Sequence, residues 1–362
     1  MLNQNHKKNR TRSVTMLVSL SLLFIIALTG CGSSPDSTSS KARAAENGES
    51  AGTTETASEK AEKVKLNIAD ISSNPVLRVA ANQGIFEKHG IEAKLVTFAT
   101  PAEGINSLFI KQADIAWGAD FPILNAVSKG EYAIIASTGN STDLSAKQWK
   151  LYVRNEIERP EDLAGKNLSF LRGTFISYLW DEYLSEYGLE PENVKFIGQG
   201  GFDEAYIALK KGEVDAVWVT GAAMVDKFEA LEGAHQLTDM SQTKVRIGSQ
   251  IIAPESLIAD KPDVVANFLD ALDESSRFVK ENPEKVADIL YKEVKQPKEA
   301  TLKDLSVINW NVEFTDSALD SLSRQKQYMV ENGIIQQDFE LKDKIKLDPL
   351  RTVFPDRVTA AP

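Results

Sequence analysis

The chain has 362 residues, of which 42% are hydrophobic and 26% are charged, so it is long enough to bury the cores of two globular lobes. Its formal net charge of −11 excludes the extended basic surface that nucleic-acid binding needs. The single cysteine, Cys31, excludes an intrachain disulfide. An acidic surface does not attract anions over long distances, so an anion site in this chain must depend on local groups.

The first 63 residues have the pattern of a targeting segment followed by a tether. Residues 1–12 carry four basic side chains and residues 14–28 are apolar, which is typical of a secretory signal. The apolar run ends in Leu-Thr-Gly-Cys31, which resembles a bacterial lipobox. That resemblance implies removal of residues 1–30, a lipid on Cys31, and a place on the extracytoplasmic face of the cell membrane. Residues 31–63 lack aromatic side chains and predict a flexible tether.

The next part of the chain alternates between short apolar runs and amphipathic segments. Strands are predicted at 66–69, 92–98, 114–117 and 132–137, with helices at 75–83, 101–111 and 123–128. The pattern continues with strands at 149–153, 167–171, 194–197 and 214–219 and helices at 173–187, 202–211 and 221–231. A strand at 247–253 returns to the first lobe, and a helical run follows at 264–280, 283–292, 302–310 and 318–331. Such alternation indicates parallel βαβ units.

Two stretches about a hundred residues apart have the same layout. Lys111–Pro122 and Lys210–Ala222 each contain a basic helix end, a turn, an aspartate, a short apolar strand with a tryptophan, and a turn of small residues. In the first stretch, Asp120 is expected to cap the helix that follows. The repetition predicts two similar α/β lobes whose strand ends face a shared cleft, which is where ligands bind in open α/β sheets.

Three segments carry a family resemblance. Residues 75–90 contain Gln-Gly-Ile-Phe-Glu-Lys-His-Gly after a helix, residues 114–122 read Asp-Ile-Ala-Trp-Gly-Ala-Asp-Phe-Pro, and residues 211–217 read Lys-Gly-Glu-Val-Asp-Ala-Val. Together they resemble the substrate-binding lipoproteins of ABC importers for aliphatic sulfonates, taurine and nitrate. The chain departs from that pattern at Arg78 and at residues 220–222, so the resemblance leaves the ligand open.

The resemblance implies an α/β, two-lobed periplasmic-binding-protein-like fold of type II, in which each lobe is a mostly parallel sheet flanked by helices. The expected division is a first lobe of residues 64–154 and 247–362 and a second lobe of residues 155–246. The expected partners are a small-molecule ligand, the permease subunits, and the membrane through the lipid only. We expect a monomer without a cofactor or a metal.

Candidate ligand-binding residues lie in the turns before helices, where free N–H groups and the positive end of a helix favour anions. They are Ser72, Ser73, Asn74, Arg78, Asp120, Phe121, Asn140, Gly173, Thr174, Phe175 and Trp218. Arg78 is the preferred counter-charge, ahead of Arg172 and Arg246, because it lies one helical turn after Asn74. Helix capping, surface ion pairing and core packing are the alternative roles for these residues.

Other functions remain open. The ligand could be a heterocycle such as a thiamine-precursor pyrimidine, held between Phe121 and Phe175 with Asp120 as acceptor. A biosynthetic enzyme is a weaker alternative, because only His89 and His235 lie beyond the signal region and no motif for phosphate or metal binding is present. A lipoprotein that only senses or adheres is a third class. We therefore expect a binding protein and no catalysis.

Overall fold

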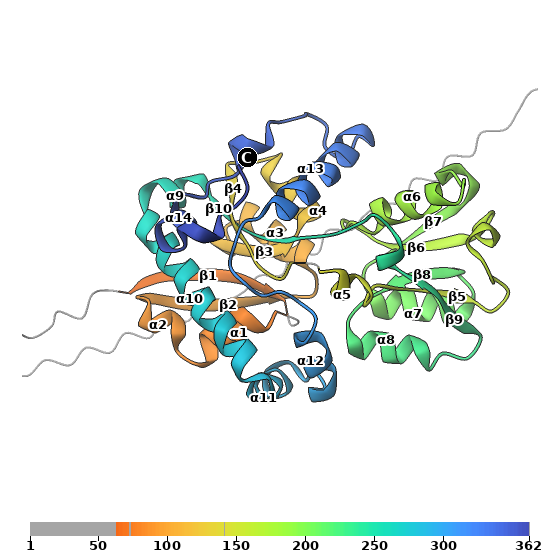
Figure 1. Ribbon diagram of the computed structural model, residues 1–362, viewed down its shortest axis with the longest axis horizontal. Coiled ribbons are helices and arrows are strands. Elements are labelled where there is room, and N and C mark those ends of the chain that lie inside the picture. Colours follow the sequence, from red (N-terminus) through yellow and green to blue (C-terminus); the bar gives the residue numbers. More distant parts are fainter. Residues whose placement is uncertain (1–62, 72–73, 141, 362) are drawn as a thin grey trace, which may run out of the picture. The chain divides into compact units, whose positions relative to one another are not determined.

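The computed structural model describes residues 63–71, 74–140 and 142–361, which form two five-stranded sheets flanked by helices (Figure 1). The predicted signal segment, Cys31 and residues 32–62 of the predicted tether lie outside the described residues. Within the described ranges, no helix combines the length and the apolar character that a membrane span requires.

The first sheet has the strand order β2-β1-β3-β10-β4. Its strands are β1 (Val64–Ile71), β2 (Ile91–Phe98), β3 (Ile115–Ala119), β4 (Tyr132–Ser137) and β10 (Ser249–Pro254). Strand β1 pairs in parallel with β2 and with β3, whereas β10 is antiparallel to both β3 and β4. Four of the five strands therefore run in one direction, and only the strand that comes from far along the chain is reversed.

Helices cover both faces of the first sheet. They are α1 (Pro75–Asn82), α2 (Ile85–Lys88), α3 (Pro101–Phe109) and α4 (Asp120–Val127). The chain moves from β1 outward to β2 and then back across β1 to β3. Right-handed crossovers therefore place α1 and α3 on opposite faces. Local signals begin these helices, because Asn74 and Thr100 cap α1 and α3 and a proline follows each cap.

The second sheet repeats this arrangement with the order β7-β6-β8-β5-β9 (green in Figure 1). Its strands are β5 (Lys150–Arg154), β6 (Asn167–Leu171), β7 (Lys195–Gln199), β8 (Ala216–Val219) and β9 (Ala234–Asp239), and its helices are α6 (Ile176–Glu186), α7 (Phe202–Lys211) and α8 (Ala222–Glu229). Strand β6 is parallel to β7 and β8, and β5 is antiparallel to β8 and β9. The predicted fold class of two mostly parallel α/β lobes is confirmed.

The internal repeat is visible in matching hydrogen bonds. The N–H of Asn67 donates to Asp114 Oδ2 over 2.7 Å, and the Asp114 N–H donates to the carbonyl of Asn67 over 2.7 Å. In the second sheet, Asn167 and Asp215 exchange the same pair of bonds over 2.8 and 2.7 Å. Asp114 therefore joins the start of β3 to β1, and Asp215 joins the start of β8 to β6.

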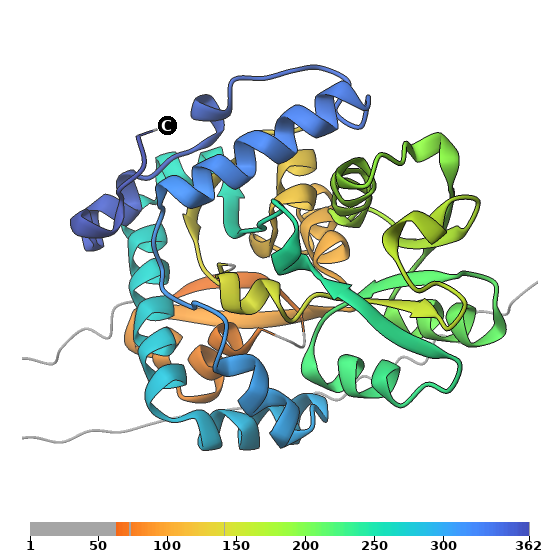
Figure 2. The ribbon, with the colours of Figure 1, turned by 45° about the vertical axis from the view of Figure 1, so that its right-hand side comes forward.

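The two sheets are built from separate stretches of the chain, and the strand pairing shifts the predicted lobe boundary by a few residues. The sequence assigned residues up to 154 to the first lobe, but β5 pairs only with strands of the second sheet. The first crossing therefore lies at about residues 147–149, before β5. The second crossing lies at residues 243–248, before β10 enters the first sheet (Figure 2).

The C-terminal part returns to the first lobe as a series of helices. They are α9 (Glu255–Asp260), α10 (Pro262–Glu281), α11 (Pro283–Val294), α12 (Lys298–Leu305), α13 (Asp316–Glu331) and α14 (Asp348–Val353), and the short α5 (Asp143–Ala146) lies near the first crossing. The predicted helix at 302–310 is wrong in its second half, because α12 ends at Leu305 and residues 306–315 form an irregular segment.

Candidate functional site

The carboxyl ends of the strands of one lobe approach the other lobe at Gly173. This residue follows β6 with a φ of +73°, and a Cβ atom built on it would lie 3.7 Å from the Cβ of Ala102, in the first turn of α3. Ala102 follows β2 of the first sheet. A strand-end turn of the second lobe and a helix start of the first lobe therefore face each other. A ligand cleft at this place stays a prediction.

Asn74 begins α1 at the end of β1. Its Oδ1 accepts hydrogen bonds from the backbone N–H groups of Val76 and Leu77 over 3.0 and 3.3 Å. Its side chain is buried, and its Nδ2 has no hydrogen-bond partner among the described residues. The side-chain oxygen of Asn74 therefore caps α1, and its side-chain nitrogen takes no part in the cap. Ser72 and Ser73, which precede it, lie outside the described residues.

Arg78 has protein partners for its charge. Its Nη2 lies 2.5 Å from Asp70 Oδ2 and donates to Thr97 Oγ1 over 3.0 Å, and its Nη1 lies 3.6 Å from Glu293 Oε2. Burial raises the pKa of Asp70 to about 7, although the positive charge of Arg78 lowers it and Glu293 raises it further. The predicted counter-charge for a ligand is thus engaged in a buried ion pair.

Asp120 is fully buried and makes no cap. Helix α4 begins at Asp120 itself, with Ala119 in the cap position. The carboxylate accepts hydrogen bonds from Gly248 N–H (2.7 Å), Gln250 Nε2 (2.9 Å), Ser321 Oγ (2.5 Å) and Gln325 Nε2 (2.9 Å). Burial raises its pKa, and these four donors oppose that effect. The prediction that Asp120 caps α4 is wrong. Its carboxylate instead holds β10 and α13 to the end of β3.

The aromatic candidates are buried in this structure. Phe121 and Phe175 are 5% and 3% exposed, and the ring of Phe175 stands edge-on to Trp149 at 4.8 Å between centroids. Trp218 is 1% exposed and contacts the rings of Trp180 and Tyr183 in the second lobe. Thr174, beside Phe175, donates from its hydroxyl to the carbonyl of Leu171 over 2.8 Å. Ligand contact by these residues stays a prediction.

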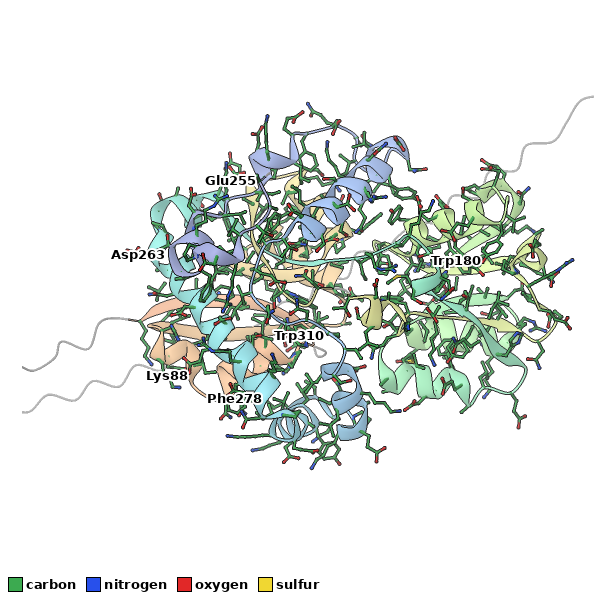
Figure 3. All side chains as sticks on the ribbon, in the orientation of Figure 1. Lys88, Trp180, Glu255, Asp263, Phe278 and Trp310 are labelled. Atoms are coloured by element: carbon green, nitrogen blue, oxygen red, sulfur yellow. The ribbon has the colours of Figure 1, made fainter. Side chains whose placement is uncertain are left out.

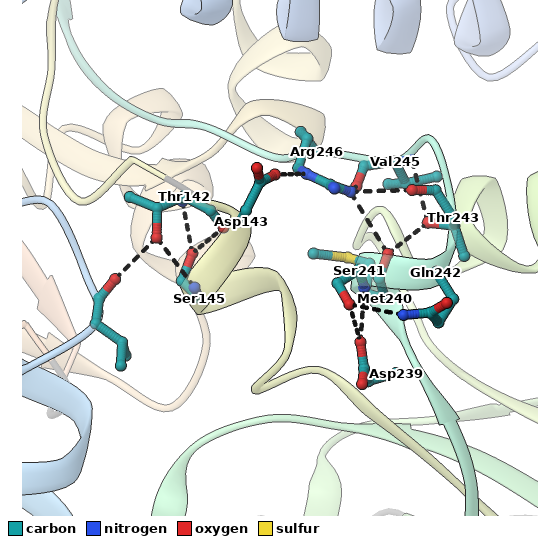
Figure 4. Close-up of polar contacts among 11 residues, drawn as sticks. Thr142, Asp143, Ser145, Asp239, Met240, Ser241, Gln242, Thr243, Val245 and Arg246 are labelled. Atoms are coloured by element: carbon teal, nitrogen blue, oxygen red, sulfur yellow. Dashed lines mark hydrogen bonds and ion pairs between the residues drawn. The ribbon is translucent and has the colours of Figure 1, made fainter.

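Arg246 joins the two crossings (Figure 4). Its Nε donates to Asp143 Oδ1 over 3.0 Å, at the start of α5 near the first crossing. Its Nη1 donates to the carbonyls of Thr243 and Val245 over 3.0 and 2.7 Å, on the second crossing. Of the other basic candidates, Arg172 donates to the carbonyl of Gly198. Both guanidinium groups thus have protein partners.

Two polar side chains near the end of β4 have no partners. Within the part of the chain that the structure describes, both amide atoms of Asn140 are buried and unpaired, and so is the Nε1 atom of Trp310. Sequence reasoning proposed Asn140 but missed Trp310, because Trp310 was assigned to a helix. It lies in the irregular segment between α12 and α13 (Figure 3). The proline-free run Leu-Ser-Val-Ile-Asn-Trp gave no signal that the helix ends early.

The two lobes, each with one antiparallel strand (β10 or β5) placed directly after a crossing, define a binding-protein type of fold. Solved structures agree: the periplasmic aliphatic sulphonate binding protein SsuA of Escherichia coli has a TM-score of 0.68 at 16% identity and matches 78% of this chain and 97% of its own. The alkanesulfonate-binding protein SsuA of Xanthomonas axonopodis pv. citri, bound to MOPS, has a TM-score of 0.67 at 15% identity, covering 79% and 99%. The desulfurization enzyme DSZB has a TM-score of 0.60 at 14% identity, covering 81% and 99%.

Sequence comparison gives the family. Residues 75–286, more than half of the chain, match the model described as NMT1/THI5 like, and the chain belongs to this family. A protein of Brucella abortus (strain 2308), named only as a binding protein, is 24% identical over 235 residues, which are 64% of this chain and 71% of that protein.

Proposed function

We propose that the protein is the solute-binding component of an ABC importer. It captures a small organic anion of the sulfonate, taurine or nitrate type between its lobes, outside the cytoplasm, and delivers it to the permease. The observation that supports this most is the approach of Gly173 to Ala102, because it brings a strand-end turn and a helix start from different lobes to one place. The likeness to sulfonate-binding proteins favours the anion class.

The hydrogen-bond geometry is compatible with hinged closure. Two short crossings connect the lobes, and Arg246 joins the crossings to each other, so the lobes can rotate while each sheet stays intact. A binding protein needs such closure to enclose its solute and to present a closed form to the permease.

Mass spectrometry under native conditions tests the ligand. Residues 32–362, purified from a bacterial host, are expected to retain or bind a compound with an acidic group, and calorimetry with taurine, butanesulfonate and nitrate should show saturable binding by at least one of them. A neutral pyrimidine as the retained compound would contradict the anion class. Uptake of the identified compound should fall in cells that lack the protein and return when it is supplied.

The lipid anchor is a separate part of the proposal. The order of basic residues, apolar run and Leu-Thr-Gly-Cys31 supports it, and Cys31 lies outside the described residues. Cells fed a labelled fatty acid should label the natural chain and should not label Cys31→Ser. Equal label on both chains would reject the anchor and would leave the ligand proposal intact.

An enzyme is the second candidate, because DSZB shares the fold at a TM-score of 0.60. The described histidines favour binding over catalysis. His89 is held by Glu274, whose Oε2 lies 3.0 Å from Nε2, and His235 lies on β9 of the second sheet. Chemical change in the retained compound during incubation with the protein would favour the enzyme.

A further inference from the structure

Two contacts between the lobes each contain a partly buried aspartate. At the first contact, Asp181 on α6 of the second lobe accepts a hydrogen bond from the Tyr328 hydroxyl on α13 over 2.6 Å. At the second contact, Asp304 on α12 accepts a hydrogen bond over 3.0 Å from the N–H of Ala222, at the start of α8 in the second lobe. Closing the lobes therefore moves one carboxylate at each contact out of water.

Each of these carboxylates has a single hydrogen-bond donor among the described residues. Asp181 has the Tyr328 hydroxyl, and Asp304 has the backbone N–H of Ala222. Both donors are neutral. One neutral donor does not replace the water that a charged carboxylate loses on burial, so the ionised form of each aspartate is at a disadvantage in the closed arrangement.

The α6–α13 contact has an excess of negative charge. Burial raises the pKa of the Tyr178 hydroxyl on α6 to about 12, and the charges of Glu182 on α6 and Asp320 on α13 raise it further, whereas Arg324 on α13 lowers it. Arg324 is the cation among these groups, and its Nε lies 2.8 Å from Asp320 Oδ2. Closure thus adds the charges of Asp181 and Glu182 to a contact whose cation is already paired.

The α12–α8 contact also places two carboxylates close to one cation. Lys303, beside Asp304, donates to Asp226 Oδ1 on α8 over 3.1 Å, and both side chains of this ion pair are exposed. Burial raises the pKa of Asp304, the charge of Asp226 raises it further, and the Ala222 N–H and the charge of Lys303 lower it. One lysine therefore faces two aspartates, and this contact too keeps a net negative charge.

Uptake of a proton by each aspartate would relieve both costs. Burial raises the pKa of Asp181, although the bond from Tyr328 opposes the shift, and Glu192 raises it further. When the lobes part, Asp181 and Asp304 return to water and burial no longer shifts their pKa. The closed form therefore holds more protons than the open form between the ordinary pKa of aspartate and the raised one. A fall in pH through the raised pKa should favour closure.

We propose that the lobes take up protons at these two contacts when they close, so that acidic surroundings favour the closed form. The consequence for transport rests on the proposed function: binding of the solute needs closure and should strengthen as the pH falls. Closure itself can be measured without solute, so the two proposals can fail separately.

Asp70 also titrates near neutral pH, but it does not distinguish the open form from the closed one. Its partner Arg78 contacts Thr97 and Glu293, and all four residues belong to the first lobe. Their contacts persist when the lobes rotate as rigid bodies. Asp70 should therefore change the stability of the first lobe with pH and leave the closure equilibrium unchanged.

Small-angle scattering from ligand-free residues 32–362, between about pH 7.5 and about pH 4.5, tests proton uptake on closure. The double variant Asp181→Asn with Asp304→Asn keeps a side-chain oxygen for each donor and cannot ionise. Asp343→Asn with Asp356→Asn removes two exposed carboxylates and is the control for the change in net charge. Circular dichroism at each pH verifies the fold.

The radius of gyration of the natural protein and of the control should fall as the pH falls. The Asp181→Asn, Asp304→Asn variant should already have the smaller radius at about pH 7.5 and should keep it at lower pH, because its contacts carry no titrating aspartate. A natural radius that stays constant or grows while the fold is retained would overturn the proposal. So would a double variant that follows the natural protein at every pH.

Calorimetry with taurine, butanesulfonate and nitrate measures the consequence for binding. The affinity of the natural protein for a probe that binds should rise as the pH falls, whereas that of the Asp181→Asn, Asp304→Asn variant should stay constant. An affinity of the natural protein that does not change with pH would overturn the link between proton uptake and binding. If none of the three probes binds, the proposed function fails, and the scattering of the ligand-free protein still decides whether closure takes up protons.

Discussion

Arg78 Nη2 lies 2.5 Å from Asp70 Oδ2, and the two side chains are 8% and 0% exposed. Burial disfavours the charged carboxylate more strongly than Arg78 favours it, so the pKa of Asp70 rises from 3.8 to about 7. The pair therefore changes its charge near neutral pH, at the strand end that leads into the candidate site.

The first prediction concerns stability and pH. Because the folded-state pKa of Asp70 is raised, the folded chain binds more protons than the unfolded chain between about pH 4 and about pH 7. The contribution of Asp70 to the free energy of unfolding should fall as the pH rises through this window and should stay level above it. Urea unfolding across that range should show a weaker fall for Asp70→Asn, with the exposed Asp356→Asn as the control. Parallel curves for Asp70→Asn and the natural chain would contradict the raised pKa.

The second prediction separates a structural Arg78 from a ligand-binding one. Arg78→Ala should lower the free energy of unfolding by about 1–3 kcal/mol, because it removes the partner of buried Asp70, whose carboxyl then takes up a proton instead of staying charged. The double variant Arg78→Met with Asp70→Asn should recover most of that loss. If the pair is structural, the double variant keeps its affinity for the identified acid within about threefold. A loss of about tenfold or more, 1.4 kcal/mol per factor of ten, would support the counter-charge role predicted from sequence.

Local signals explain what the sequence predicted well. Periodicity and caps gave the alternation of strands and helices, and the two similar stretches gave two lobes. Contacts between residues that lie far apart in the sequence could not be predicted. The partners of Asp120 on α13, Ser321 and Gln325, follow it by about two hundred residues. The pairing of β5 with β8 and β9 likewise depends on register in a sheet that the apolar pattern alone does not specify.

Only some residues of the candidate site were predicted, because local signals do not report contacts between distant parts of the chain. Turn residues such as Asn74 and Gly173 were identified because strand ends and helix starts have local signatures. The pairing of Arg78 with Asp70 was missed because it depends on the strand folding back beside the helix. Trp310 was missed because its apolar neighbours fit a helical period equally well, and only the contact with Gly139 fixes the irregular backbone.

The third prediction tests the internal repeat. Asp114→Ala and Asp215→Ala each leave a backbone N–H without its acceptor, that of Asn67 on β1 or of Asn167 on β6, at 2.7 and 2.8 Å in the natural chain. Each should lower the free energy of unfolding by about 1–3 kcal/mol. Because the two sites lie in different sheets and share no partner, the double variant should lose the sum. Asp348→Ala, on the exposed start of α14, is the control. If Asp114→Ala lowers the free energy of unfolding and Asp215→Ala does not, the two halves of the repeat are not equivalent.

The last prediction concerns closure of the lobes. Hydrogen bonds link the C-terminal helices of the first lobe to the second. The Tyr328 hydroxyl on α13 donates to Asp181 Oδ2 on α6 over 2.6 Å, and the Ala222 N–H at the start of α8 donates to Asp304 Oδ1 on α12 over 3.0 Å. The exposed Lys303 on α12 also donates to Asp226 Oδ1 on α8 over 3.1 Å, and the variants below leave that ion pair in place. Both aspartates are partly buried, and this burial raises the pKa of Asp181 and of Asp304.

These bonds favour the closed arrangement before any ligand is present, and a hydrogen bond to a charged group contributes about 1.5–3 kcal/mol. The combined variant Tyr328→Phe with Asp304→Ala should therefore open more easily. Small-angle scattering should give it a larger radius of gyration than the natural protein without ligand and an equal one at saturation. Its apparent affinity should fall, since part of the binding energy is needed to close the lobes. Tyr291→Phe with Asp343→Ala, at an exposed tyrosine and an exposed aspartate, should behave as the natural chain. Equal radii in both ligand-free proteins would show that the two bonds do not hold the lobes together.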